Sequence, residues 1–131
     1  MSEPQISRRA VEKFFTLLFS GKLSEAERTL ERMRKRYKLG EDDPYYKALY
    51  GIYYTYVNDD KDSYTFQIWE RFLEGESKRK LVSQVKELLK TMHDPPERYL
   101  KAWLDLIELL DKLPQPHKIK KQVSQEAGRE G

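Results

Sequence analysis

The stretch DPYYKALYGIYYTYV, residues 43–57, is the most informative part of this chain for its fold. An aspartate followed by proline commonly begins an α-helix, because the acid caps free amide groups and proline fits the first turn. Apolar and aromatic side chains then recur every three or four residues, which is the helical period. The stretch therefore predicts an α-helix from Asp43–Pro44 to about Val57.

This predicted helix carries more rings than one buried face needs. Six tyrosines stand within 12 positions, whereas an apolar stripe about 100° wide is enough to join a core. One stripe contains Tyr46, Leu49, Tyr50, Tyr53 and Val57, and a second contains Tyr45, Ala48, Ile52 and Tyr56. Tyr54 belongs clearly to neither, so we expect some rings to remain at the surface.

The helical period continues on both sides of this stretch. It predicts further helices over residues 7–20, 24–39, 63–73, 77–92 and 96–113. Ser24 and Glu27 form a capping-box pattern, and Gly21 and Gly40 suit helix stops. We therefore predict a mainly α protein, a compact bundle of about six helices in antiparallel hairpins.

The domain organisation follows from where the periodicity ends. A chain of 131 residues fits one domain, and we place it at residues 1–112. From Leu113 onward the sequence is polar, basic and aperiodic. We therefore expect residues 113–131 to form a flexible basic tail.

Charge is abundant but nearly balanced. Charged residues make up 36% of the chain, against an average near 25%. The net charge is +3, of which residues 113–131 contribute +2 and residues 1–112 only +1. Electrostatic attraction must therefore come from local patches. The many Lys, Glu and Arg residues, the single asparagine and the absence of cysteine are typical of a thermophile.

The residues needed for most kinds of catalysis are missing. The sequence has no cysteine, so disulfides, thiol catalysis and Cys-ligated zinc are excluded. His93 and His117 are isolated from each other, and there is no glycine-rich phosphate loop or nucleophile-elbow motif. We expect no enzymatic activity, no cofactor and no metal site.

The same composition gives expectations about location. No apolar run exceeds three residues, and the first residues show no secretory pattern. We expect no membrane partner and a cytoplasmic location, with association to the nucleoid or the ribosome left open.

Aromatic density points to a binding function. Surface rings beside positive charge suit single-stranded nucleic acid, because bases stack on rings, for about 1–3 kcal/mol each, while Lys and Arg contact phosphates. We expect four rings to stack with bases, namely Tyr53, Tyr54, Tyr56 and Phe66. We expect five cations to contact phosphates, namely Lys47, Lys61, Arg71, Arg98 and Lys101. Trp69 and Trp103 are assigned to the core. The alternative interpretation is that the tyrosines line the edge of the core with their hydroxyls in water.

A separate basic run, RMRKRYK, occupies residues 32–38. It is typical of a solvated helix face near a helix C-terminus, where cations interact favourably with the helix dipole. Contact with phosphates is the alternative interpretation.

The order of motifs over residues 8–112 resembles the archaeal ThermoDBP and ThermoDBP-related proteins. These motifs are GKLSEA at 21–26, YYKALYG at 45–51, Tyr64-Thr-Phe66, and HDPPERYLKAWLD at 93–105. The resemblance implies binding of single-stranded DNA, with RNA left open, through a cleft of aromatic and basic residues. The founding member has a C-terminal coiled coil for dimerisation, whereas residues 113–131 lack heptads, so a homodimer or a protein partner is left open.

A second resemblance gives the alternative function. GKLSEA followed by Leu30, and then YGIYY at 50–54, is similar to a tetratricopeptide hairpin and the start of the next one. This resemblance implies a protein–protein interaction module that holds a peptide or a helix in a groove.

Overall fold

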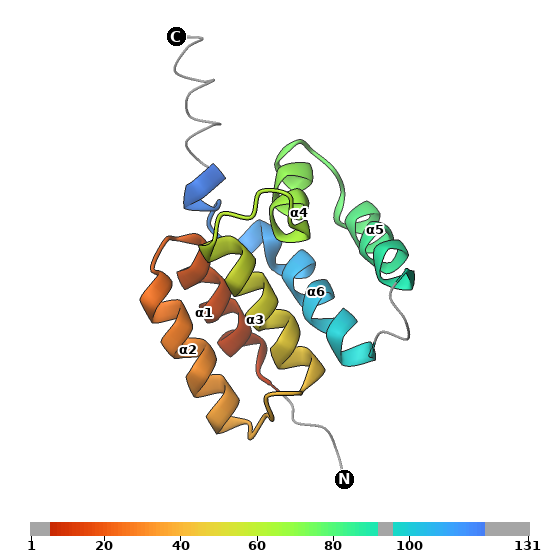
Figure 1. Ribbon diagram of the computed structural model, residues 1–131. Helices are drawn as coiled ribbons and strands as arrows, with labels where there is room; N and C mark the ends of the chain where they lie inside the picture. Colours follow the sequence, from red (N-terminus) through yellow and green to blue (C-terminus); the bar gives the residue numbers. More distant parts are fainter. Residues whose placement is uncertain (1–5, 92–95, 120–131) are drawn as a thin grey trace.

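The computed structural model describes residues 6–91 and 96–119 of the chain, which form the bundle shown in Figure 1. The helices are α1 (Arg8–Phe19), α2 (Leu23–Arg36), α3 (Pro44–Val57), α4 (Tyr64–Leu73), α5 (Lys78–Lys90) and α6 (Glu97–Leu109), followed by the short 3-10 helix η1 (Leu110–Lys112). The described residues contain no β-strand, which confirms the prediction of a mainly α fold. Among them, no helix has the length and apolar character needed to span a membrane.

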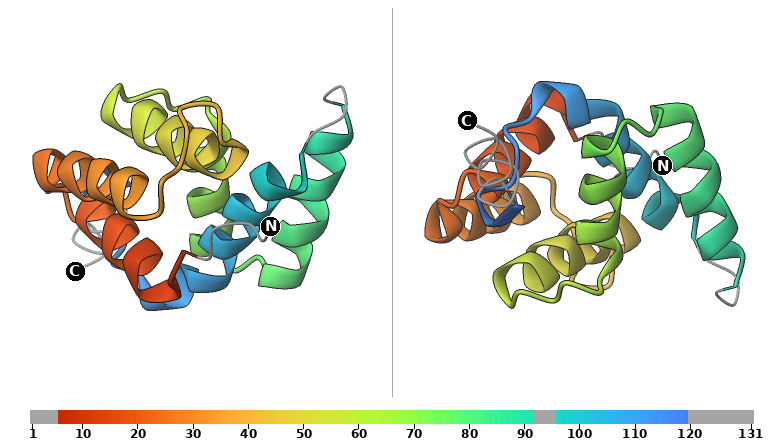
Figure 2. Two further views of the ribbon diagram at one scale, coloured as in Figure 1. Left: turned by 90° about the horizontal axis from the view of Figure 1, so that it is seen from below. Right: turned by 90° about the horizontal axis from the view of Figure 1, so that it is seen from above.

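Helix α3 lies at the centre of the bundle. Its most extensive packing is against α6, and α2 and α4 also contact it. Helices α1 and α2 form an antiparallel hairpin, and α5 packs against α4 and α6. Two further views place α2 at one end of the molecule and α5 at the other (Figure 2).

The face of α3 that enters the core is the second of the two predicted stripes. Tyr45, Ala48, Leu49, Ile52 and Tyr56 are buried, and Tyr56 is 0% exposed. Helices α2, α4 and α6 all pack on α3. The buried face of α3 is therefore wider than the face that one neighbouring helix would cover. The other stripe, apart from Leu49, lies at the edge of the core or in solvent.

The core is rich in rings that meet edge to face. The ring centroid of Phe19 lies 5.1 Å from that of Tyr56 and 5.2 Å from that of Trp69. The ring of Phe66 stacks on Tyr56 at 5.3 Å and is 1% exposed. Trp69 and Trp103 are buried, as predicted. Aromatic pairs of this kind contribute about 0.5–1.5 kcal/mol each beyond the area they bury.

Several helix ends agree with the sequence, whereas those of α2 do not. Ser7, Asp43 and Ser77 cap α1, α3 and α5 by accepting a hydrogen bond from the backbone amide three residues on. Gly21 has a φ of 93°, as a left-handed helix stop requires. The predicted capping box at residues 24–27 is wrong, because the tight turn at Gly21 lets α2 begin already at Leu23, with no side-chain cap. After α2, the left-handed residue is Lys38, with a φ of 55°, and not Gly40.

Residues 113–119 pack against the helical domain. Leu113, Pro116 and Ile119 are buried against the domain. The Lys118 ammonium donates to the backbone oxygen of Tyr56 at 2.7 Å and pairs with Asp59 at 2.7 Å. The prediction of a flexible tail is therefore wrong for residues 113–119, which the end of α3 holds in place. The rest of the predicted tail, residues 120–131, lies outside the described residues, as does His93.

Candidate functional site

Of the four rings predicted to stack with bases, the structure leaves one exposed. Tyr54 is 56% exposed and Tyr53 is half-buried, both on α3. Tyr56 and Phe66 are enclosed in the core, so the prediction that they stack with bases is wrong. Their positions depend on three helices packing around α3, which the spacing within one helix does not reveal.

The five predicted phosphate contacts do not gather in one place. Lys47 is exposed on α3, and the Lys61 ammonium lies 4.5 Å from the centre of the Phe66 ring. Lys101 is exposed on α6 but donates to Asp105 at 3.1 Å. Arg71 lies in a separate groove between α4 and α5.

Arg98 is committed to a structural role. Its guanidinium donates to both carboxylate oxygens of Asp43 at 2.8 Å, and the two side chains are only 16% and 14% exposed. The prediction that Arg98 contacts phosphates is therefore wrong. Sequence reasoning missed this ion pair because its partners stand 55 residues apart and meet only when α6 packs on α3.

A ladder of three tyrosines runs along the outer face of α3. Tyr46, Tyr50 and Tyr54 follow each other at intervals of four residues, so their rings lie one above the next. The ring centroids of Tyr46 and Tyr50 are 6.3 Å apart, and those of Tyr50 and Tyr54 are 6.2 Å apart. Tyr50 is 45% exposed, and it is the surface ring that sequence reasoning assigned to the core stripe.

The tyrosine ladder lies in a groove of balanced charge. The groove has a volume of about 660 Å³ and contains the cations Arg34 and Lys47 together with the acids Glu31 and Glu41. Arg34 is paired with Glu31 at 2.6 Å, and the hydrogen bond from Arg34 lowers the pKa of Glu31. The ladder therefore offers flat apolar surface without a net positive charge.

Positive charge gathers in another groove, on the opposite side of α2, between α1 and α2. This basic groove has a volume of about 800 Å³, and five cations line it: Arg9, Lys13, Arg32, Lys35 and Arg36. No carboxylate is among its lining residues. In the described part of the chain, no carboxylate oxygen lies within 4.0 Å of any of the five charged groups.

Local structure explains why these cations face each other. Arg9 and Lys13 are four residues apart on α1, and Arg32, Lys35 and Arg36 follow the spacing that places side chains on one helix face. The antiparallel hairpin then sets the first turns of α1 beside the last turns of α2. The Tyr37 hydroxyl accepts a hydrogen bond from the Ser7 amide at 3.3 Å, which joins the two helices at this end.

The basic run at 32–38 was visible in the sequence, but its partners on α1 were not singled out. Isolated cations such as Arg9 and Lys13 do not by themselves predict a basic groove. They form one only because the hairpin places them beside the basic residues of α2. The described residues contain no cluster of three His, Asp or Glu side chains that could hold a metal ion.

Comparison of the chain with protein-family models, with curated proteins and with solved structures gives no match. The resemblances to ThermoDBP-related proteins and to tetratricopeptide hairpins therefore stay predictions.

Proposed function

We propose that this protein binds single-stranded nucleic acid, with backbone phosphates in the basic groove between α1 and α2 and bases against Tyr50 and Tyr54. The observation that carries the proposal is the set of five cations in a groove without a carboxylate. The resemblance of residues 8–112 to ThermoDBP-related proteins predicts the same class of ligand.

Cations that share a groove repel one another, and a row of phosphates relieves that repulsion. Each phosphate neutralised by Lys or Arg also releases condensed counterions, which favours binding at low salt. Arg adds fork-shaped hydrogen bonding to phosphate oxygens. The net charge of only +3 does not oppose this proposal, because the attraction depends on the local patch.

The tyrosine ladder favours single strands over duplexes. Unpaired bases stack on exposed rings, whereas bases inside a duplex have their faces covered. Helix α2 separates the ladder from the basic groove, and a helix is about 10–12 Å across. A strand of a few nucleotides therefore spans from one groove to the other over α2. Contacts with phosphates and ring faces read no base edges, so we expect tolerance of sequence.

The test uses fluorescence anisotropy of labelled single-stranded and duplex oligonucleotides with the full chain. A groove variant carries Lys13→Ala, Arg32→Ala and Lys35→Ala. A control variant carries Arg79→Ala, Lys86→Ala and Lys90→Ala, three exposed cations of α5 that lie at the other end of the molecule. Both variants lower the net charge from +3 to zero, so any difference between them reports position.

We expect the groove variant to bind single-stranded DNA about 3- to 150-fold more weakly than wild type, because exposed ionic contacts contribute about 0.2–1 kcal/mol each. The control variant should stay close to wild type. The double substitution Tyr50→Ala and Tyr54→Ala should weaken single-strand binding and leave duplex binding unchanged.

Three results would reject the proposal. The first is no binding to any single-stranded oligonucleotide, and the second is an equal loss in the groove and control variants. The third is tighter binding of a labelled polyglutamate peptide than of DNA, which would support the protein-interaction alternative.

A further inference from the structure

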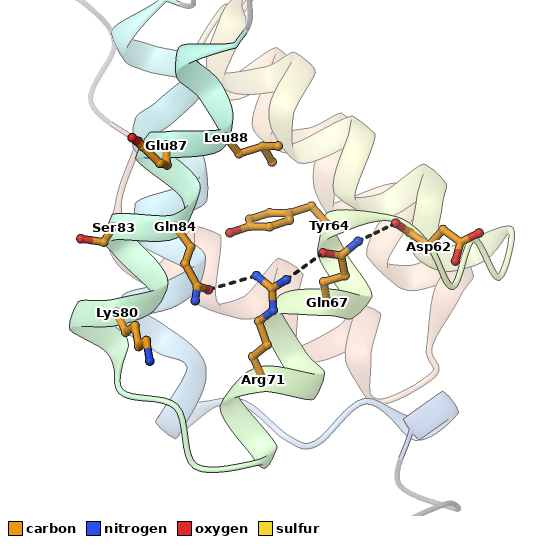
Figure 3. A pocket seen from close by; sticks show the side chains of 9 residues that line it. All are labelled: Asp62, Tyr64, Gln67, Arg71, Lys80, Ser83, Gln84, Glu87 and Leu88. Atoms are coloured by element: carbon orange, nitrogen blue, oxygen red, sulfur yellow. Dashed lines mark hydrogen bonds between the residues drawn. The ribbon is translucent and has the colours of Figure 1, made fainter.

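A third groove lies between α4 and α5 (Figure 3), and it shares no lining residue with either surface described above. Its volume is about 740 Å³. Helix α4 and the turn before it supply Asp62, Tyr64, Gln67 and Arg71, and α5 supplies Lys80, Ser83, Gln84, Glu87 and Leu88. The Arg71 guanidinium stands between the two helices, below the ring of Tyr64 (Figure 3).

The Arg71 side chain is held in position from both helices. It donates to the side-chain oxygen of Gln84 at 3.0 Å and to that of Gln67 at 3.3 Å. The amide groups of the two glutamines are themselves anchored. Gln84 donates to Glu76 at 2.6 Å, and Gln67 donates to the backbone oxygen of Asp62 at 2.9 Å. Neutral oxygens therefore hold the guanidinium in place before a ligand binds. The entropic cost of ordering this side chain on binding is then small.

Arg71 has no acidic counterpart within the described ranges. No carboxylate oxygen lies within 4.0 Å of its guanidinium, although the side chain is half-buried. An arginine carries five N–H donors, and the two glutamines accept from two of its nitrogens. The remaining donors suit a carboxylate, which pairs with a guanidinium through two parallel hydrogen bonds.

The groove also has an apolar wall. The Tyr64 ring lies 5.9 Å from the Arg71 guanidinium carbon, and Leu88 is 43% exposed beside it. The Tyr64 hydroxyl points toward α5 and is buried, and the Arg71 guanidinium interacts with it. The formal charges of the lining cancel, since Asp62 and Glu87 balance Arg71 and Lys80. This balance disfavours a polyanion, and the Arg71 guanidinium, which has no carboxylate nearby in the described ranges, favours a ligand with a single negative charge.

We propose that the groove between α4 and α5 binds a small monocarboxylate with an aryl or alkyl body. The carboxylate pairs with Arg71, and the apolar body lies against Tyr64 and Leu88. This site is independent of nucleic-acid binding, because it shares no residue with the basic groove or the tyrosine ladder.

The test is a titration of the full chain with 3-phenylpropionate, followed by NMR shifts of backbone amides and side-chain amides. We expect saturable shifts at Gln67 and Gln84, with a dissociation constant on the order of 1 mM for a ligand of this size. The neutral analogue 3-phenylpropanamide should bind at least about tenfold more weakly, because it lacks the charge that Arg71 recognises. Acetate, which lacks the apolar body, should also bind more weakly.

Two substitutions locate the site. Arg71→Lys keeps the charge but loses the fork-shaped donor set, so we expect affinity to fall by about tenfold. Leu88→Ser removes an exposed apolar side chain and should weaken 3-phenylpropionate without affecting acetate. This second variant tests the site even where Arg71→Lys perturbs folding. Arg79→Lys on the exposed face of α5 serves as the matched control and should behave as wild type.

The proposal is overturned by equal binding of the acid and its amide, by unchanged affinity in Arg71→Lys and Leu88→Ser, or by tighter binding of inorganic phosphate than of 3-phenylpropionate. The absence of saturable shifts at Gln67 and Gln84 overturns it as well. None of these results bears on oligonucleotide binding, so the two proposals fail separately.

Discussion

Replacing Asp43 by alanine removes two interactions at once. The carboxylate caps α3 by accepting from the Tyr46 amide at 3.0 Å, and it pairs with Arg98 of α6 at 2.8 Å. Asp43 therefore joins the start of the central helix to the helix that packs on it most extensively. We expect Asp43→Ala to be among the most destabilising single substitutions in the described part of the chain.

The magnitude follows from adding the two losses. A lost side-chain cap costs about 1 kcal/mol. Breaking a buried ion pair by removing one of its members costs about 3–5 kcal/mol, and the Arg98 side chain is only 16% exposed. The sum is about 4–6 kcal/mol, a large part of the roughly 5–15 kcal/mol that stabilises a domain. Asp43→Asn keeps the cap acceptor and should cost about 1 kcal/mol less than Asp43→Ala.

Urea unfolding followed by circular dichroism measures these free energies. A double-mutant cycle of Asp43→Asn and Arg98→Met isolates the ion pair, and we expect a coupling energy of about 1–3 kcal/mol. Arg98→Met should leave oligonucleotide affinity unchanged. A coupling energy below about 0.5 kcal/mol, or a loss of oligonucleotide binding in Arg98→Met at full stability, would refute the structural role of Arg98.

Three further predictions concern the fold. Burial raises the pKa of Tyr56 to about 12, above the usual value near 10, so its ionisation favours unfolding; stability should hold below about pH 10 and fall from pH 10 toward 12. Tyr56→Phe should flatten that part of the profile in urea titrations, and an unchanged slope would contradict this. Gly21→Ala should lower the free energy of unfolding by about 1–2 kcal/mol, because φ is 93° and the added Cβ lies 3.1 Å from the His117 ring. An unchanged melting temperature would contradict it. Lys38→Gly should raise stability by about 0.5–1 kcal/mol, since Lys38 has a φ of 55°, and a fall in melting temperature would count against it.

Most helix bounds were predictable because their causes are local. The cap of α3 at Asp43 and the left-handed turn at Gly21 depend only on residues adjacent in the sequence. The end of α2 was not predictable from the sequence. Lys38 adopts the left-handed conformation there, although Gly40, two residues later, is the residue type that favours it. Leu39, the residue after Lys38, is buried and only 4% exposed, a tertiary contact that the local sequence does not reveal.

The assignment of rings was less predictable, because it depends on what surrounds α3. Two stripes of similar width compete in residues 44–57, and the sequence alone does not rank them. Packing by α2, α4 and α6 buries the stripe that ends at Tyr56 and turns Tyr50 outward. Only part of the basic groove was predictable from the sequence. The basic run at 32–38 is contiguous, whereas Arg9 and Lys13 join it only because α1 and α2 form a hairpin.

The salt dependence of single-strand binding tests the central claim most directly. For single strands, log K falls with log salt at a slope of about −0.7 for each phosphate neutralised. Five groove cations in contact with phosphates would give a slope of about −3.5, and the groove variant, with three cations removed, should reduce its steepness by about 2. The control variant on α5 should keep the wild-type slope. A wild-type slope near zero, or equal slopes in the groove variant and the wild type, would contradict phosphate binding between α1 and α2.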